Sequence, residues 1–326
     1  MHPQTVRGDA RRERLRLPGQ PRVVQERRRR NLTAQTDFVK LGALSVVAMS
    51  PVVWIMISFL FWNVYNKSLD THVARLVVRN DVDVVMLAEC PDRPETILDS
   101  LNAISQERFT FPFSEGNRIR IFTRFPERTL VDWFNSNGDR LTIRRLRPHD
   151  ETDLLLCVLH FQSRRTGWTE SNQAVEATAI ARDIADAEDR AFHQRTLLVG
   201  DMNMNPFDPG MLEARALNAV MTADLAKKET RKVSGSRYRF FYNPMWGLVG
   251  DRTPGPAGTH FYGSGLPSTT FWHMYDQVLI RPQLIDKLAE VTILDSDGEV
   301  PLVTQAGRPN KKSISDHLPI LFRLDL

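Results

Sequence analysis

Apolar and polar residues alternate along most of this chain in two ways, one typical of helices and one typical of strands. Apolar residues at helical spacing predict helices over residues 69–80, 93–104 and 171–190. The last of these is the clearest amphipathic helix, because acidic residues lie opposite its apolar side. That apolar side carries Val175, Ala179, Ile180, Ile184 and Ala187.

Strand-like runs lie between and after these helices. DVDVVMLAEC follows the first helix, residues 117–125 alternate like a half-buried strand, and residues 153–160 form a near-continuous apolar run. RTLLVGDMNMNP contains another strand that stops at Gly200, and MYDQVLI and LPILFRL predict two more. Residues 234–272, rich in Gly, Pro and aromatic residues, predict a surface loop region. Together these elements predict an α/β core with several sheet strands.

The run from Leu41 to Asn66 contains no charged residue and allows two interpretations. A membrane-spanning helix needs about 20 apolar residues, and the Arg and Lys residues before the run fit a positive-inside anchor. Pro51 and the β-branched and aromatic residues of ISFLFWN instead favour a strand that starts next to Met56. If ISFLFWN is a strand, residues 41–56 alone fall short of the ~20 residues that cross a bilayer. We therefore favour residues 1–55 as a disordered leader or an over-extended reading frame, which predicts a cytoplasmic protein. Membrane association through 41–56 is the alternative.

Charge is distributed unevenly along the chain. The net charge is +4, but residues 1–40 alone hold eleven Lys or Arg and four Asp or Glu. This segment is expected to be disordered. The rest of the chain holds 32 basic and 35 acidic residues, so a tight sequence-independent grip on nucleic acid is not predicted. Cys90 and Cys157 both lie in apolar runs and are expected to be buried free thiols.

Polar residues stand where five of the predicted strands end or begin. Such side chains are costly at these positions unless they converge on a metal or an anionic ligand. A single one of them is usually only a strand terminus, and Asp201 and Asn203 after Gly200 also fit an Asx turn. The full set consists of Asn63, Glu89, His160, Asp201 with Asn203, and Asp316 with His317.

Most of these residues lie in four short motifs: WN with Asn63, LAEC with Glu89, GDMN with Asp201, and SDHLPI with Asp316. Together the four motifs resemble those of the endonuclease/exonuclease/phosphatase superfamily. Its members include DNase I-like nucleases, abasic-site endonucleases, inositol polyphosphate 5-phosphatases and neutral sphingomyelinases. The resemblance covers residues 57–326 and implies one catalytic domain. The implied fold is a four-layer sandwich of two packed mixed β-sheets flanked by helices.

The resemblance also implies a role for each motif residue. Glu89 would be the main ligand of Mg²⁺, or of Mn²⁺, assisted by Asn63 and Asp316, since hard cations take oxygen ligands. Asp201 would orient or deprotonate the attacking water, with Asn203 beside it. The remaining roles concern phosphate: His160 and His317 would stabilise its developing charge, and Asp276 would hold His317 in its charged form.

The sequence departs from the family pattern near the metal. Tyr65 stands where many relatives have a second Asn or Asp, and Ala88 stands in place of the common Gln before the metal Glu. Arg124 is expected either to contact phosphate or to form a surface salt bridge. No family motif contains His193, His260 or His273, so these three are expected to be structural or loop residues.

Phosphoester hydrolysis by an activated water is the implied reaction, and specificity is expected from the loop at 237–265. The aromatic residues of this loop are expected either to stack on bases or to form the buried underside of the loop. The buried role is favoured for Phe240, Phe241 and Trp246. Arg237 and Arg239 are candidate phosphate contacts. A nuclease or phosphodiesterase is the first hypothesis and a phosphatase or phospholipase-like enzyme the second. A catalytically inactive binding module is the third, and a monomer is expected.

Overall fold

The computed structural model describes residues 56–112, 116, 118–135, 139–148, 153–263, 267 and 269–326. The predicted leader 1–40 and residues 41–55 of the apolar segment lie outside them. No helix within the described ranges has the length and apolar character that crossing a bilayer requires. The strand interpretation of ISFLFWN is confirmed, because Met56–Asn63 forms a strand that is buried from Ile57 onward.

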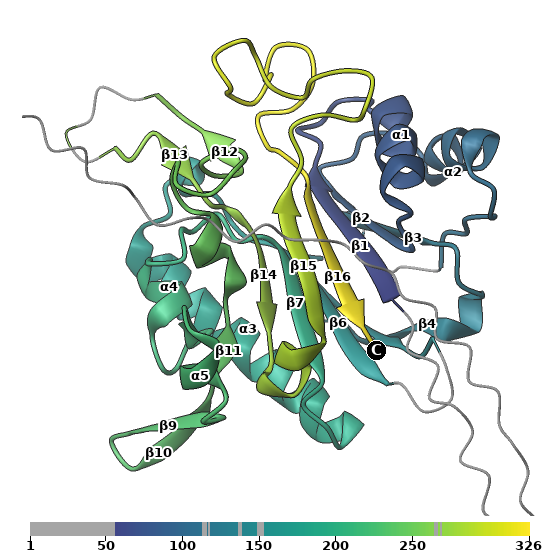
Figure 1. Cartoon of the computed structure of the whole chain (residues 1–326). Helices are drawn as coiled ribbons and strands as arrows, with labels where there is room; N and C mark the ends of the chain where they lie inside the picture. The colour runs from purple at the N-terminus through teal and green to yellow at the C-terminus, as the bar shows by residue number, and fades with distance from the viewer. Residues whose placement is uncertain are drawn as a thin grey trace, which may run out of the picture. The chain divides into compact units, whose positions relative to one another are not determined.

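Two mixed β-sheets form the centre of the described chain (Figure 1). The first sheet has five strands, in the order β15 (Leu288–Ile293), β16 (Ile320–Asp325), β1 (Met56–Asn63), β2 (Val84–Ala88) and β3 (Ile119–Thr123). The second has seven, in the order β4 (Leu130–Asn135), β5 (Leu141–Leu146), β6 (Leu154–His160), β7 (Thr196–Asp201), β14 (Asp276–Ile280), β11 (Phe241–Tyr242) and β8 (Ala219–Val220).

Each large sheet contains a central pair of parallel strands. In the first sheet β1 runs parallel to β2, and Asn63 at the end of β1 pairs with Ala88. In the second sheet β6 runs parallel to β7, and His160 pairs with Asp201. The carboxyl ends of two parallel strands lie at the same edge of their sheet. The polar residues at the carboxyl ends of β1 and β2 therefore lie at one edge of the first sheet, and those at the ends of β6 and β7 lie at one edge of the second.

The helices cover the outer faces of the two sheets and make the predicted four layers. Helices α1 (Asp70–Asn80) and α2 (Pro94–Ile104) pack on the first sheet, and α3 (Glu170–Ala191) packs on the second. The remaining helical segments are short: α4 (Pro209–Leu212), α5 (Ala223–Ala226), and the 3-10 turns η1 (Glu127–Thr129), η2 (Arg164–Thr166), η3 (Pro244–Leu248) and η4 (Pro282–Lys287).

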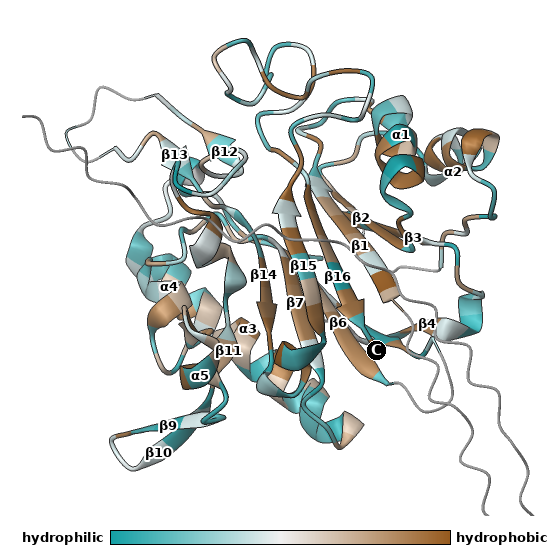
Figure 2. Ribbon diagram, viewed as in Figure 1, coloured by the Kyte–Doolittle hydropathy of each residue, from teal (hydrophilic) through white to brown (hydrophobic). Residues whose placement is uncertain are grey.

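Strand β6 explains how the layers hold together. Its side chains alternate between the two faces of the sheet, as in any strand. Leu154, Leu156 and Val158 join the core between the sheets, whereas Leu155 and Cys157 join the core under α3. Both faces of this strand are therefore apolar, and Figure 2 shows the same brown colour along the central strands of both sheets. Cys90 and Cys157 are free and buried.

The sequence predicted an irregular surface loop over residues 234–272, but the structure contains short regular elements in this segment. It contains the turn η3 and three short strands: β10 (Ser236–Arg239) paired with β9 (Thr230–Val233), β11 paired with β14 and β8, and β12 (His260–Phe261) paired with β13 (Trp272–His273). Phe240 and Phe241 are buried, at 3% and 0% exposure, which supports the interpretation of these two rings as the underside of the loop.

Candidate active site

The edges of the two sheets meet where the parallel strands end. Asn63 Nδ2, on the first sheet, donates to Asp201 Oδ2 of the second sheet over 3.0 Å. The same Nδ2 lies 3.4 Å from Glu89 Oε1. His160 Nε2, at the end of β6, lies 3.3 Å from the same Glu89 oxygen. Four residues predicted from strand ends are thus brought into one site.

Glu89 is held by contacts from both sheets. Its backbone has a φ of 51°, a left-handed conformation that few non-glycine residues adopt. Asn66 Nδ2 donates to Glu89 Oε2 over 2.8 Å, so Asn66 supplies an amide next to the place where relatives have a second Asn or Asp. The hydrogen bond from His160 lowers the pKa of Glu89, against the effect of burial, so the side chain is an anion at neutral pH.

Asp201 lies at the centre of the site. Its Oδ2 is 3.9 Å from the Nε2 atoms of both His160 and His317. Its Oδ1 accepts from the backbone N–H of Asn203 over 2.9 Å, which is the Asx turn considered from the sequence. Asp201 therefore forms the Asx turn with Asn203 and also lies close to Asn63 and the two histidines, so both interpretations of the sequence hold. Asn203 Nδ2 donates to the Phe161 carbonyl over 3.0 Å, which fixes this amide.

His317 is paired with a buried carboxylate. Its Nδ1 lies 2.7 Å from Asp276 Oδ2, and Asp276 is fully buried at the start of β14. Burial opposes a charge on His317, but the carboxylates of Asp276 and Asp201 outweigh it and raise its pKa to about 10. At neutral pH His317 is therefore a cation whose Nε2 faces Asp201.

Asp316 lies on the other side of His317 from Asp276. Lys311 Nζ is 3.1 Å from Asp316 Oδ2, and His260 Nε2 is 3.8 Å from the same oxygen. Burial opposes ionisation, but His260, His317 and Lys311 hold the pKa of Asp316 at about 2. Asp316 Oδ1 is buried and has no hydrogen-bond partner.

The segment Ser315–His317 is tied to strand β1. Ser315 Oγ donates to the Asn63 carbonyl over 2.7 Å and accepts from the His317 N–H over 3.0 Å. Trp62 Nε1 donates to the His317 carbonyl over 2.9 Å. These contacts explain why a serine precedes the Asp-His pair: it fixes the loop to the strand that carries Asn63.

His260 belongs to the site, although the sequence had assigned it a structural or loop role. It forms a β-bridge with His317, and the two ring centroids are 4.7 Å apart. Burial lowers the pKa of His260, so it is neutral beside the charged His317. Only the backbone pairing of residues 260 and 317 indicates that His260 belongs to the site, and no local sequence pattern predicts that pairing. His273 stacks on Tyr275 nearby, and His193 lies against Asp153.

The three candidate phosphate-binding arginines lie away from this site. Arg124 follows β3 at the opposite end of the first sheet from Glu89, and it pairs with Asp83 over 2.7 Å and also with Asp81. The structure thus supports its salt-bridge interpretation. Arg237 and Arg239 lie on β10, and Arg239 pairs with acidic residues at the C-terminal end of α3. We assign none of the three a role at the catalytic centre.

The oxygen donors of the site fit a hard divalent cation. Glu89 is ionised and its side chain is 28% exposed, and the buried Oδ1 of Asp316 has no partner. Asn63 acts here as a hydrogen-bond donor to two carboxylates, so its role as a metal ligand stays a prediction. Among the described residues, two groups of three acidic or histidine side chains have ligand atoms that all lie within 4.8 Å of one another: His260 with Asp316 and His317, and Asp201 with Asp276 and His317. In both groups the Nδ1 atom of His317 already lies 2.7 Å from Asp276 Oδ2.

A family model for the endonuclease/exonuclease/phosphatase family matches residues 60–317. The chain belongs to this family. The match contains every predicted site residue, from Asn63 at its start to His317 at its end. Membership supports a hydrolase that acts on phosphoester bonds.

Solved structures agree with the family fold. A truncated TDP2 from Caenorhabditis elegans is similar, with a TM-score of 0.51, 16% identity, and coverage of 83% of this chain and 98% of that one. A family protein from Leptotrichia buccalis gives a TM-score of 0.50 and 12% identity, over 83% of this chain and 100% of that one. At these identities the likeness concerns the fold alone, and it confirms the predicted DNase I-like fold of two mixed sheets. No curated protein matches the sequence.

Proposed function

We propose that this family member is a Mg²⁺-dependent phosphodiesterase that hydrolyses nucleic acid. The observation that carries the proposal is the position of Asp201, which lies between two histidines and is held by Asn63. A carboxylate in this position can accept a proton from water while the histidines face the phosphate. The side-chain contacts of Asp201 within the described residues come from Asn63, Asn203, His160 and His317, and none comes from a serine or cysteine. Water is therefore favoured as the nucleophile.

The residues of the site divide the reaction between them. Asp201 orients a water and takes its proton as the water oxygen attacks phosphorus. The charged His317 donates from Nε2 to a phosphate oxygen, and His160 Nε2 faces the same space. Glu89 and Asp316 would hold the cation, which when bound neutralises phosphate charge and stabilises the leaving oxygen. The bond from phosphorus to that oxygen breaks, the leaving alkoxide takes a proton from solvent water, and Asp201 returns its proton to solvent, so that the products are a phosphomonoester and an alcohol.

A hairpin beside His260 favours nucleic acid as the substrate. Phe261 follows His260 on β12, and Trp272 lies edge-on to it on β13, with ring centroids 5.4 Å apart. Tyr262 and Phe271 at the hairpin are 54% and 48% exposed. Arg308 lies over the Phe261 ring at 4.2 Å. Exposed aromatic rings and a cation next to a phosphate site fit the stacking of unpaired bases.

The proposal is tested with a panel of single-stranded DNA, nicked duplex DNA, RNA, an inositol phosphate and sphingomyelin in Mg²⁺. We expect hydrolysis of the nucleic acids, and we expect Phe271→Ala, which removes one of the exposed rings, to raise KM for single-stranded DNA by about tenfold, since a stacked base contributes about 1–3 kcal/mol. The matched control is Phe192→Ala, which removes a ring that is 94% exposed at the end of α3.

Two results would count against nucleic acid as the substrate. One is hydrolysis of the inositol phosphate or sphingomyelin alone. This would favour a phosphatase or phospholipase-like enzyme, the function that fits the slightly acidic charge balance after residue 40. The other is an equal effect of Phe271→Ala and Phe192→Ala on KM.

The pH profile is expected to report the charge on His317. Its pKa is raised from 6.5 to about 10, so the protonated form is the active one at neutral pH, and the rate should fall as pH rises through about 10. Replacing Asp276 by Asn removes the closest carboxylate, and the alkaline limb should then move toward the ordinary value of 6.5. The measurement is kcat/KM against pH for both proteins. An alkaline limb that does not move in Asp276→Asn would contradict this role of the pair.

A further inference from the structure

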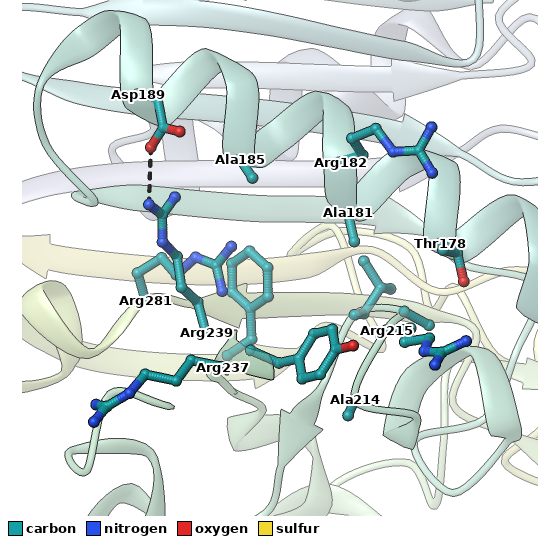
Figure 3. Close-up of a pocket in the computed structure, with 14 residues that line it drawn as sticks. Thr178, Ala181, Arg182, Ala185, Asp189, Ala214, Arg215, Arg237, Arg239 and Arg281 are labelled. Carbon is teal, nitrogen blue, oxygen red and sulfur yellow. Dashed lines mark hydrogen bonds and ion pairs between the residues drawn. The ribbon is translucent and has the colours of Figure 1, made fainter. Parts of the chain in front are cut away.

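A pocket lies on the outer side of the second sheet, between α3 and the hairpin strand β10 (Figure 3). Its volume is about 450 Å³, a size typical of sites for small molecules. One wall is the middle and C-terminal part of α3, and the others are the segment 214–217 and β10, with Phe241 and Arg281 also lining it. The pocket contains Arg237 and Arg239, the two arginines that the sequence had suggested as phosphate contacts.

The pocket is separate from the catalytic centre. Helix α3 touches that centre near its N-terminus, where Gln173 Nε2 donates to the Asn203 carbonyl over 3.0 Å. Arg182 is nine residues further along the same helix, which is about 14 Å at 1.5 Å per residue. None of the catalytic or metal-binding residues lines the pocket.

Two of the five arginines that line the pocket are neutralised by carboxylates. Arg281 is buried and lies 2.7 Å from Glu188 Oε1. Arg239 lies 3.0 Å from Glu188 Oε2 and 2.8 Å from Asp189 Oδ1, the contact marked in Figure 3. The two acidic residues thus balance these two guanidinium groups, and no acidic residue of the lining is left for the other three.

The other three arginines are Arg182, Arg215 and Arg237. Within the described parts of the chain none of them makes an ion pair or a side-chain hydrogen bond. Figure 3 shows Arg182 of α3 and Arg215 of the segment 214–217 at the same end of the pocket as Thr178, whereas Arg237 extends toward the other end. Three arginines that make no ion pair or side-chain hydrogen bond among the described residues therefore line different walls of one cavity.

The lining between these arginines is largely apolar. Ala181 and Ala185 on α3, Ala214, Leu217 and the rings of Tyr238 and Phe241 all belong to this lining. A guanidinium group binds a phosphate through paired hydrogen bonds, and an apolar wall with aromatic rings suits a flat, weakly polar body. The combination matches a small molecule that carries a phosphate on a planar group.

We propose that this pocket is a second anion site, which binds a small phosphorylated molecule of nucleotide size independently of the catalytic centre. Arg182 and Arg215 hold the phosphate from opposite walls, and the planar part of the ligand lies along the alanines of α3. Arg237 adds positive charge at the far end. This site does not depend on the proposed substrate of the enzyme.

The test is equilibrium binding by calorimetry in EDTA, with adenosine 5′-monophosphate, inorganic phosphate and a single-stranded oligonucleotide as probes. We expect the monophosphate to bind, and Arg182→Ala and Arg215→Ala each to weaken its binding by about tenfold or more, because hydrogen bonds to a charged group are among the strong ones. Arg128→Ala, which removes an exposed arginine of η1, is the matched control and should leave binding unchanged.

The catalytic-site variant Asp201→Asn distinguishes the two sites. If the pocket binds the monophosphate, this variant keeps the full affinity while Arg182→Ala and Arg215→Ala lose it. The proposal is overturned if Asp201→Asn alone weakens binding, if all variants bind equally, or if only the oligonucleotide binds. It is also overturned if neither the monophosphate nor phosphate binds at millimolar concentration. All of the arginine variants change exposed side chains, so loss of folding is not expected, and thermal unfolding checks it.

Discussion

Replacing Asp201 by Asn is expected to lower kcat for a phosphodiester by about 10²–10⁴-fold, the range that general acid–base catalysis contributes. Asn has nearly the same shape as Asp and cannot accept the proton of the attacking water. The change also places an amide opposite Asn63 Nδ2, which now donates to the carboxylate over 3.0 Å. We expect KM to change little, because the loss concerns the transition state.

The matched control for this prediction is Asp286→Asn. Asp286 is an exposed carboxylate paired with Lys227 on the surface, so its loss should leave kcat unchanged. Steady-state kinetics of both variants give the comparison, and urea unfolding of both shows that the fold is kept. A variant at Asp201 that hydrolyses the substrate at the full rate would remove this residue as the base.

Removing divalent cations is expected to reduce hydrolysis to the background rate, and added Mg²⁺ or Mn²⁺ should restore it. The physical reason is the donor set: ionised Glu89 and the unpartnered Oδ1 of Asp316 offer oxygen ligands to a hard cation. Glu89→Gln keeps the shape of the side chain and removes one charge. It should raise the Mg²⁺ concentration for half-maximal rate by at least about tenfold.

The control for the metal prediction is Glu95→Gln, an exposed carboxylate in the first turn of α2. Its Mg²⁺ requirement should equal that of the unchanged protein. The measurement is rate against Mg²⁺ concentration after dialysis into EDTA. Equal rates with and without EDTA would exclude the metal mechanism, while equal Mg²⁺ curves for Glu89→Gln and Glu95→Gln would place the cation elsewhere.

The sequence predicted which polar side chains end the apolar strands, and the structure brings four of them together, while their catalytic and metal-binding roles stay predictions. Asn63, His160 and Asp201 end buried strands and Glu89 directly follows one, and parallel pairing brings the ends of such strands to one edge of a sheet. The three long helices were predicted within a residue or so of their observed bounds, because their apolar spacing is local. Local patterns therefore sufficed wherever the answer depended on one element and its termini.

Residues placed by contacts distant in the sequence were not predicted. His260 reaches the site only because its backbone bridges to His317. Arg239 was expected near substrate, yet the pairing of β9 with β10 and the carboxylate of Glu188 place it on the outer side of the second sheet. Both outcomes are set by tertiary pairing, which overrides the composition of a loop.

The hydrogen bond between Asn63 and Asp201 joins a residue of one sheet to a residue of the other. No catalytic group is complete within a single sheet, so activity exists only while the two sheets are docked. Substitutions deep in the core between the sheets, far from phosphate, should then lower kcat in proportion to how much they loosen that docking. Hydrolysis rate becomes a sensitive reporter of core packing in this protein, and a loss of activity before any loss of secondary structure would mark the moment when the sheets separate.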